Sequence, residues 1–285
     1  SPRGIHEHVG EPAMAQLVAG EGVLVLDQTP FYPEGGGQVG DRGVVENKDF
    51  LFQVFDTQRR EGATLHYGRV SRGEPKVGSA CRAKVDKDLR EATKRNHTAT
   101  HLLQAALRSV LGSHIRQVGS LVNSEKLRFD YTHGKALTKD EIKRREDWVN
   151  RVALESVPVE ARTETYESAI ETGALAFFGE KYGDQVRTIH VPGRSKELCG
   201  GTHCHNTGEI GAFVITSETS IGTGTRRIEA ITGVNVVRYL KDLEQKLSQI
   251  ASALKVHPDQ VTDRIGRLQD EVREGVRGGK SGMKA

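Results

Sequence analysis

The sequence has few cysteines, almost no tryptophan and no long apolar run. Its 285 residues include three cysteines, one tryptophan and two methionines, and aromatic residues account for 5%. A sparse, odd number of cysteines excludes the disulfide framework of a small secreted scaffold and indicates a reducing compartment, so we expect a cytoplasmic protein. No segment approaches the roughly eighteen consecutive apolar residues of a transmembrane helix, so none is expected to span a membrane.

Neither sign of charge dominates, and the N-terminus carries no targeting signal. The 41 Lys and Arg nearly balance the 38 Asp and Glu, with a net charge of +3. This balance neither requires nor excludes nucleic acid as a partner. The chain begins "SPRGIHEHVG", without Met and without a charged-then-apolar signal pattern. We interpret this start as a cut or processed end and expect a fragment with two domains and an appendage.

Residues from about 20 to 87 are expected to form short strands. "GVLVLD" and "FLFQVFD" are apolar strand runs, and "VGSACRAKVD" alternates with period two. Glycine and proline punctuate them, as in "TPFYPEGGGQVGDRG" and "SRGEPKVG". Several short strands at this spacing predict a small β-barrel.

The pattern becomes mixed helix and strand at Asp88. "DLREATKRNHTATHLLQAALRSVLG" predicts a helix with Asp88 as its N-cap and Gly112 as its stop, and "SLVNSEKLRFDY" predicts a hairpin turning at 123–126. "TKDEIKRREDWVNRVALES" predicts an amphipathic helix whose Thr138 and Glu141 form a capping box. "VPVEART", "QVRTIHV", "GAFVITSE" and "TRRIEAIT" read as strands, with a short helix at 166–171. This block is therefore expected to be α+β with an antiparallel sheet.

From Val234 onward the sequence predicts helices. In "VNVVRYLKDLEQKLSQIASALKV" the apolar residues recur at spacings of three and four, and a second helix starts at Pro258. An amphipathic helix of this kind needs a partner, either from its own chain or from another. We interpret 234–285 as a truncated helical linker.

The stretch "ELCGGTHCHN" places four potential metal ligands within seven residues, Cys199, His203, Cys204 and His205. A tetrahedral zinc site needs four donors, so this run is one site, half of one, or none. The two glycines in "CGGTH" allow a tight loop that turns Cys199 and His203 toward one ion. Cys204 is then expected to be a small buried hydrophobic residue, and His205 to lie at the surface.

The helix with "NHTATHLL" offers the other half of such a site. His97 and His101 are spaced i, i+4, so both imidazoles leave the same face of the helix. The motif lacks the Glu of HExxH, which disfavours a zinc protease. The ligand set we favour is His97, His101, Cys199 and His203, and an i, i+4 histidine pair with no metal is the alternative.

Several motifs closely resemble the editing domain of alanyl-tRNA synthetase. They are "RNHTATHLL", "QVGSLV" with "LRFDY", "FFGEKYGDQVR" and "ELCGGTH…TGEIG…RRIEAITG", in the family's order. "LDQTPFYPEGGGQVGDRG" resembles the glycine-rich motif of the β-barrel that precedes that domain. The resemblance covers roughly residues 20 to 235. It implies a barrel at 1–88, a zinc editing domain at 89–233 and a linker at 234–285. The aminoacylation domain, which binds ATP in the full-length enzyme, has no counterpart here.

The resemblance implies a zinc-dependent aminoacyl-tRNA hydrolase that acts on seryl- and glycyl-tRNA(Ala). A pocket sized for alanine admits glycine and rejects serine poorly, which makes a second hydrolytic site necessary. The implied partners are the acceptor end of tRNA(Ala) and the remaining domains of a parent synthetase. Stand-alone editing proteins of the same superfamily share the motifs, and "YPEGGG" is closer to their form.

The resemblance also implies roles for individual residues. Thr100 matches the threonine that senses the seryl hydroxyl, and Gln117 matches an active-site glutamine. Cys199 is expected to bind zinc as the thiolate, and its use as a nucleophile lacks an obvious base. The residues implied in substrate or tRNA binding are Gly35, Gly36, Gly37, Gln38, Arg226 and Arg227.

A non-catalytic reading also accounts for the ligand set. Four protein ligands make a closed site, which is the pattern of structural rather than catalytic zinc. The alternative function is therefore a zinc-stabilised tRNA-binding module.

Overall fold

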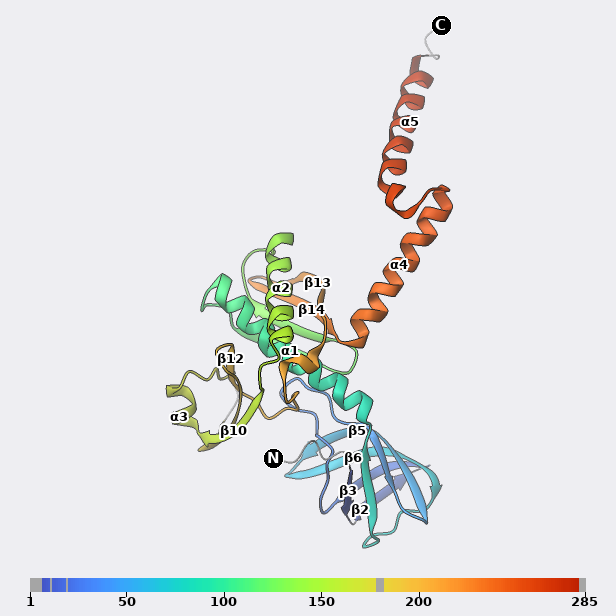
Figure 1. Cartoon of the computed structure of the whole chain (residues 1–285). Coiled ribbons are helices and arrows are strands. Elements are labelled where there is room, and N and C mark those ends of the chain that lie inside the picture. The colour runs from blue at the N-terminus through green and yellow to red at the C-terminus, as the bar shows by residue number, and fades with distance from the viewer. Residues whose placement is uncertain (1–6, 11, 19, 178–181, 282–285) are drawn as a thin grey trace. The chain divides into compact units, whose positions relative to one another are not determined.

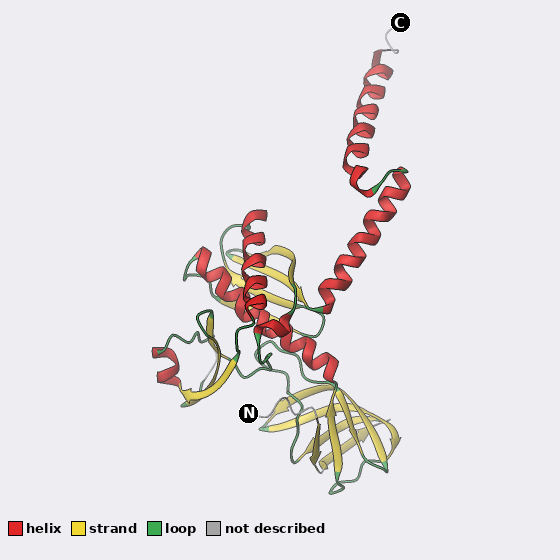
Figure 2. Ribbon diagram, viewed as in Figure 1, coloured by secondary structure: helices red, strands yellow, loops and turns green. Residues whose placement is uncertain are grey.

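The computed structural model describes residues 7–10, 12–18, 20–177 and 182–281 (Figure 1). They divide into two compact units, one that ends at Val234 and one that begins at Asn235. Residues 178–181, within the motif "FFGEKYGDQVR", lie outside the described residues. The described fold is α+β, with antiparallel sheets and several helices, as the sequence predicted (Figure 2).

A seven-stranded antiparallel sheet begins the first unit, with the order β1-β7-β4-β5-β6-β3-β2. Its strands are β1 (Glu7–Gly10), β2 (Pro12–Val18), β3 (Glu21–Leu26), β4 (Gly43–Glu46), β5 (Phe50–Arg60), β6 (Ala63–Gly73) and β7 (Cys81–Val85). The alternation predicted for "CRAKV" is confirmed, because Cys81, Ala83 and Val85 are buried and the two residues between them are exposed. Together with Phe50 and Phe52, these residues belong to a core confined to this sheet and its loops.

The helix α1 (Lys87–Leu111) follows directly and is 25 residues long. The prediction of Asp88 as its N-cap was wrong: Asp86 has extended backbone, and its carboxylate accepts from the backbone N–H of Leu89 at 3.1 Å. Asp88 therefore lies in the first turn, where a carboxylate is also favourable. Gly112 ends the helix as predicted, and its N–H donates to the Arg108 carbonyl at 3.0 Å.

A four-stranded antiparallel sheet, ordered β13-β14-β9-β8, packs with α1 and α2. Its strands are β8 (Gln117–Val122), β9 (Leu127–Thr132), β13 (Phe213–Gly222) and β14 (Thr225–Thr232), and α2 spans Lys139–Glu155. The predicted hairpin turns at 123–126, where the Asn123 N–H donates to the Lys126 carbonyl at 3.1 Å. The capping box of Thr138 and Glu141 is confirmed in both halves.

One stripe of α1 fills the main core. Ala99, Leu102, Leu103, Ala106 and Leu107 are at most 1% exposed and pack with residues of both hairpins and α2. The helix is also buried on its histidine side, where His97 and His101 are 4% and 2% exposed. A helix buried on two sides is held firmly enough to fix the positions of its polar groups.

A three-stranded sheet, β10-β11-β12, completes the first unit. Its strands are β10 (Glu160–Thr165), β11 (Gln185–Val191) and β12 (Ser195–Leu198), with α3 (Tyr166–Glu171) packed against β10 and β11. The 3-10 turn η1 (Thr207–Ile210) packs with α1 and α2. The chain leaves β12 directly into "CGGTH", so this small sheet delivers the second pair of predicted ligands.

The second unit is helical. It contains all but the first residue of α4 (Val234–Leu254), the turn η2 (Pro258–Gln260) and α5 (Val261–Ser281). Leu240, Leu243, Leu247 and Ile250, on the predicted apolar seam of α4, are 42–54% exposed. None of the described helices is both long enough and apolar enough to cross a membrane.

Candidate metal centre

The structure brings together the four ligands favoured from the sequence. One donor atom from each of His97, His101, Cys199 and His203 lies within 4.8 Å of the others. Cys199 Sγ is 3.5 Å from His97 Nε2 and 3.3 Å from His203 Nε2. As predicted, Cys204 points elsewhere and is 2% exposed in the main core, where burial raises the pKa of its thiol to about 12.

Each histidine of the cluster has its Nδ1 beside an oxygen atom. His97 Nδ1 is 2.7 Å from Gln38 Oε1, and His203 Nδ1 is 3.1 Å from Thr98 Oγ1. His101 Nδ1 is 3.5 Å from Glu197 Oε2, and neither atom has a hydrogen-bond partner within the described residues. At His97 the partner is an amide oxygen, which can only accept, so the proton lies on Nδ1 and Nε2 is bare, as is usual for a histidine oriented toward a metal.

The backbone of the cysteine loop, residues 199–203, is fixed by one arginine. Arg187 on β11 donates through Nη1 to the carbonyls of Cys199 (2.9 Å) and Gly201 (2.7 Å). The Gly201 N–H lies 3.4 Å from Cys199 Sγ, where a donor favours the thiolate.

Burial keeps the three imidazoles neutral. It lowers the pKa of His97 to about 3, with the Arg187 charge acting in the same direction. Burial likewise lowers the pKa values of His101 and His203 well below the ordinary value, and the neighbouring imidazoles add to the effect. Neutral imidazole is the form that binds a metal ion.

The cluster fits a zinc ion in its donor chemistry and spacing. Bonds of about 2.3 Å to sulfur and 2.0–2.1 Å to nitrogen, at tetrahedral angles, separate the two donors by about 3.5 Å. The two sulfur–nitrogen distances, 3.5 and 3.3 Å, match that separation. Three buried imidazoles and one thiol are also the donor types that zinc prefers.

A cavity of about 580 Å³ opens beside the cluster. Thr100 and Gln117, both singled out from the sequence, line it together with Cys199. The Thr100 hydroxyl donates to the Asn96 carbonyl at 2.8 Å, so its lone pairs remain available as acceptors. Gln117 Nε2 donates to Ser120 Oγ at 3.2 Å.

The glycine loop, residues 33–38, meets the same site. Gly35 and Gly36 line the cavity. Gly37 packs against β8: its carbonyl accepts from the Val122 N–H at 2.7 Å, and a Cβ added at Gly37 would overlap Ser120. Gln38 is fully buried and bonded to His97.

The arginines of "RRIEA" have acidic partners within the fold. Arg226 makes a two-pronged contact with Glu218, and Arg227 does the same with Asp130 at 2.7 and 2.9 Å. The neighbouring Glu229 carboxylate accepts from Lys126 at 2.6 Å. The structure thus places both guanidinium groups on internal partners.

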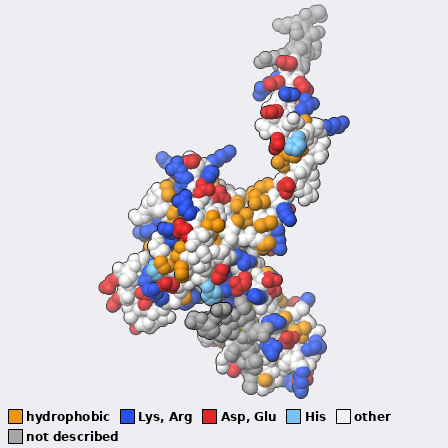
Figure 3. Space-filling view, in the orientation of Figure 1, with side chains coloured by type: hydrophobic (Ala, Val, Ile, Leu, Met, Phe, Trp, Pro, Cys, Tyr) orange, Lys and Arg blue, Asp and Glu red, His pale blue; other side chains and the backbone are white. Residues whose placement is uncertain are grey.

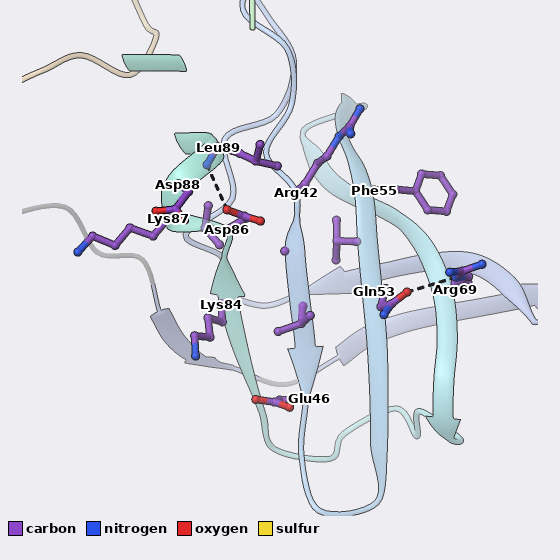
Figure 4. Close-up of a pocket in the computed structure, with 14 residues that line it drawn as sticks. Arg42, Glu46, Gln53, Phe55, Arg69, Lys84, Asp86, Lys87, Asp88 and Leu89 are labelled. Carbon is purple, nitrogen blue, oxygen red and sulfur yellow. Dashed lines mark hydrogen bonds between the residues drawn. The ribbon is translucent and has the colours of Figure 1, made fainter. Parts of the chain in front are cut away.

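A second depression, of about 630 Å³, lies on the seven-stranded sheet beside the start of α1 (Figure 4). Its rim mixes basic residues such as Arg42 and Lys84 with the acidic Glu46 and Asp88. The face drawn in Figure 3 likewise intersperses both signs of charge. This mixture gives the depression no uniform potential for a phosphate chain, and no predicted site residue lies there.

Four residues around the cluster were not assigned a metal-site role from the sequence. Gln38 was expected at the substrate, whereas Thr98, Arg187 and Glu197 were not singled out. Thr98 adjoins a ligand in sequence and Glu197 opens the quoted "ELCGGTH", so proximity was an available signal for both. Arg187 had the signal of one charge within the strand run "QVRTIHV", and it is the last residue of the quoted motif "FFGEKYGDQVR".

Comparison with known proteins places two segments in synthetase families. Residues 8–89 match the family described as "tRNA synthetases class II (A)", and residues 186–229 match "Threonyl and Alanyl tRNA synthetase second additional domain". The chain is 48% identical over 268 residues to alanine--tRNA ligases of Burkholderia thailandensis, Burkholderia mallei and Burkholderia pseudomallei. These alignments cover 93% of this chain and 30% of each relative. The chain thus spans about a third of the length of those relatives, and the resemblance to alanyl-tRNA synthetase is confirmed.

Proposed function

Because the chain belongs to the alanyl-tRNA synthetase family over the segment it shares with those enzymes, we propose that it hydrolyses mischarged seryl- and glycyl-tRNA(Ala). One observation carries the proposal: the cavity of about 580 Å³ that is lined by both the metal cluster and the polar side chains of Thr100 and Gln117. A metal site with no cavity would not support catalysis, and a cavity of this size accommodates an aminoacyl ester.

The reaction is the addition of water to the ester carbonyl. The carbon–oxygen bond to the ribose breaks, and the ribose oxygen leaves with a proton. Zinc, held by His97, His101, Cys199 and His203, would supply Lewis-acid polarisation or a lower pKa for water. The protein's own contribution is to position the substrate against that cluster.

Thr100 is suited to recognise serine. Since its hydroxyl proton is already donated to the Asn96 carbonyl, its oxygen acts as an acceptor for a seryl O–H. Alanine, which must be spared, offers no such donor. Gln117, whose amide nitrogen donates to Ser120, retains its carbonyl oxygen to orient water or the amino acid.

Gly35 and Gly36, which line the cavity, approach the acceptor end of tRNA(Ala), while the buried or paired side chains of Gln38, Arg226 and Arg227 support internal roles.

We assign a barrel to 1–88, the editing domain to 89–233 and a linker to 234–285. The single core of the seven-stranded sheet supports the barrel. The similarity to alanine--tRNA ligases favours a segment of a synthetase over a stand-alone editing protein. We place the protein in the cytoplasm.

The second candidate is a zinc-stabilised RNA-binding module, which the closed set of four ligands favours. In that case the metal would tie α1 to the cysteine loop, and no turnover would occur.

Release of amino acid from Ser-tRNA(Ala) and Gly-tRNA(Ala) separates the two. We expect the zinc-loaded protein to hydrolyse both. Thr100→Val should slow serine release by roughly 5- to 150-fold, the equivalent of about 1–3 kcal/mol, and glycine release much less. Cys199→Ala should lose zinc and activity together.

The matched control is Thr163→Val, at an exposed threonine on β10, which should behave as the wild type. Circular dichroism and bound zinc are measured for every variant. A folded, zinc-loaded wild type that leaves both esters intact would overturn the hydrolase and leave the module.

A further inference from the structure

The amide of Gln38 joins the glycine loop to the metal cluster. Gln38 is fully buried, and its Oε1 lies 2.7 Å from His97 Nδ1 and 2.9 Å from the backbone nitrogen of Thr202. Its Nε2 donates to Thr202 Oγ1 at 2.9 Å. One side chain thus contacts a predicted ligand on α1 and the loop that carries two others.

These contacts settle which end of the amide faces His97. The backbone N–H of Thr202 can only donate, so the amide atom it meets must be the oxygen. The same oxygen then accepts from His97 Nδ1–H, and His97 Nε2 is left bare toward Cys199 Sγ. The position of the His97 proton is therefore determined by a residue 59 positions earlier in the chain.

Gln38 differs from the other two oxygen partners in where it comes from. Thr98 lies on α1, and Glu197 lies on β12 next to the cysteine loop. Gln38 comes from the loop between β3 and β4 of the seven-stranded sheet. It therefore links the cluster to that sheet.

The glycine loop is attached firmly enough for Gln38 to act in this way. The Val39 N–H donates to the Val122 carbonyl at 3.1 Å, and the Val122 N–H donates to the Gly37 carbonyl at 2.7 Å. Just beyond Gln38, the buried carboxylate of Asp41 pairs with Arg90 of α1. Gln38 is therefore fixed on both sides by contacts outside the metal cluster.

We propose that Gln38 is a positioning residue for the metal centre, which orients His97 and holds the cysteine loop at Thr202. This inference rests on the proposed zinc site. Gln38 acts on metal binding through His97 and does not contact the substrate. The seven-stranded sheet thereby contributes directly to the metal affinity of the unit to which it belongs.

Two replacements at Gln38 separate orientation from packing. Gln38→Met keeps the approximate volume but removes both hydrogen-bonding ends, so His97 Nδ1–H and the Thr202 N–H lose their acceptor. Gln38→Glu keeps an acceptor for both, and the Thr202 hydroxyl can donate to its second oxygen. The matched control is Gln53→Met, at an exposed glutamine on β5.

Zinc affinity is measured on the full chain by competition with a chromophoric chelator, and Co²⁺ is substituted to record its visible absorption. Gln38→Met should weaken zinc binding by about 10- to 100-fold, as expected for the loss of a partner to a ligating histidine. Gln38→Glu should restore the affinity to within a few-fold of the wild type and shift the cobalt absorption bands, because a carboxylate raises the basicity of His97. Gln53→Met should match the wild type.

The failures of the two proposals are distinguishable. A wild type that binds no zinc overturns the zinc site and this inference with it. A wild type that binds zinc, with Gln38→Met binding equally tightly, overturns the inference alone. If Gln38→Met does not fold, Gln38→Glu decides: a cobalt spectrum and affinity unchanged from the wild type would show that the amide does not act on the metal.

Discussion

Two glycine-rich loops reach His97, and they contribute different things. The cysteine loop, residues 199–203, presents side chains to the metal, and its backbone is held by Arg187. The glycine loop, residues 33–38, presents mainly backbone, which bonds to β8, and one amide side chain. Glycine-rich composition alone therefore does not indicate a phosphate cradle.

The glycines within each loop are not equivalent. A Cβ at Gly201 would overlap the His97 ring and lie 2.9 Å from Gln38 Oε1, whereas one at Gly200 would meet nothing within 4 Å. Likewise, Gly37 (φ +82°) faces Ser120, whereas Gly36 (φ +56°) faces open space. Each motif contains one glycine that the packing requires and a neighbour that it does not.

The largest expected effect is that of acid on the free energy of unfolding. Acid protonates the histidines around the cysteine loop, whereas the glycine loop contains no histidine. In the unfolded chain these histidines have pKa values of about 6.5. Burial lowers the pKa of His97 to about 3 and also lowers those of His101 and His203. The unfolded state therefore binds more protons, and the free energy of unfolding falls as pH drops below about 6.5. Each group contributes up to about 1.4 kcal/mol per pH unit.

Denaturant titrations of chelator-treated protein at pH 8, 7, 6 and 5 measure this effect. The expected curve declines below pH 7, and the buried carboxyl of Glu197, whose pKa burial raises to about 8, offsets about one histidine's share of that slope. Burial also lowers the pKa of His66, on β6 of the seven-stranded sheet, to about 4. His66→Gln is therefore a control, which should remove only the contribution of His66 to the pH dependence of the unfolding free energy. An unfolding free energy that stays constant from pH 7 to 5 would contradict the assignment of neutral buried imidazoles.

Gly201→Ala should have the next largest effect, because the added methyl displaces the His97 ring. We expect a loss of about 1–3 kcal/mol in unfolding free energy from overpacking, with zinc binding weakened strongly. Gly200→Ala is the matched control and should bind zinc normally. Equal zinc affinities in the two variants, measured side by side, would show that the cysteine loop tolerates a shift at Gly201.

Gly37→Ala should cost less, since the nearest overlap is with the flexible Ser120 side chain, although the Ser120 carbonyl carbon and oxygen are also close. A left-handed conformation costs a non-glycine residue roughly 1–2 kcal/mol, and Gly36→Ala should show that term alone. The difference between the two in thermal or chemical unfolding measures the packing of Gly37 against β8. No difference would mean that the glycine loop is held by Gln38 and Asp41 rather than by this contact.

Much of the fold followed from local pattern. The strand alternation at 81–85, the capping box of Thr138 and the hairpin turn at 123–126 each depend on residues close in sequence. The ligand set was also accessible, because i, i+4 spacing on a helix and a tight glycine loop each bring two donors together. The N-cap was predicted at Asp88 but lies at Asp86. Both residues are aspartates, so the sequence could not distinguish them, and only the backbone conformation does.

The remainder depended on contacts between distant segments. Nothing local to "PEGGGQ" indicates that Gln38 reaches His97, and nothing local to "RRIEA" indicates that Arg226 and Arg227 pair with Glu218 and Asp130. Such partners could not be predicted from the sequence, because they meet only in the folded structure and a glutamine reads the same in the sequence whether it is buried or exposed.

Because Arg90 pairs with Asp41 and His97 bonds to Gln38, the spacing of two residues along α1 must match the spacing of two residues in the chain that leaves the glycine loop. Arg90 and His97 are seven positions apart on the helix, a rise of about 10 Å. Gln38 and Asp41 are three positions apart, and a fully extended chain of that length spans about the same distance. A deletion in either interval would leave the loop too short or shift the helix by 100° per residue, so chains that keep both contacts should keep both intervals free of insertions and deletions.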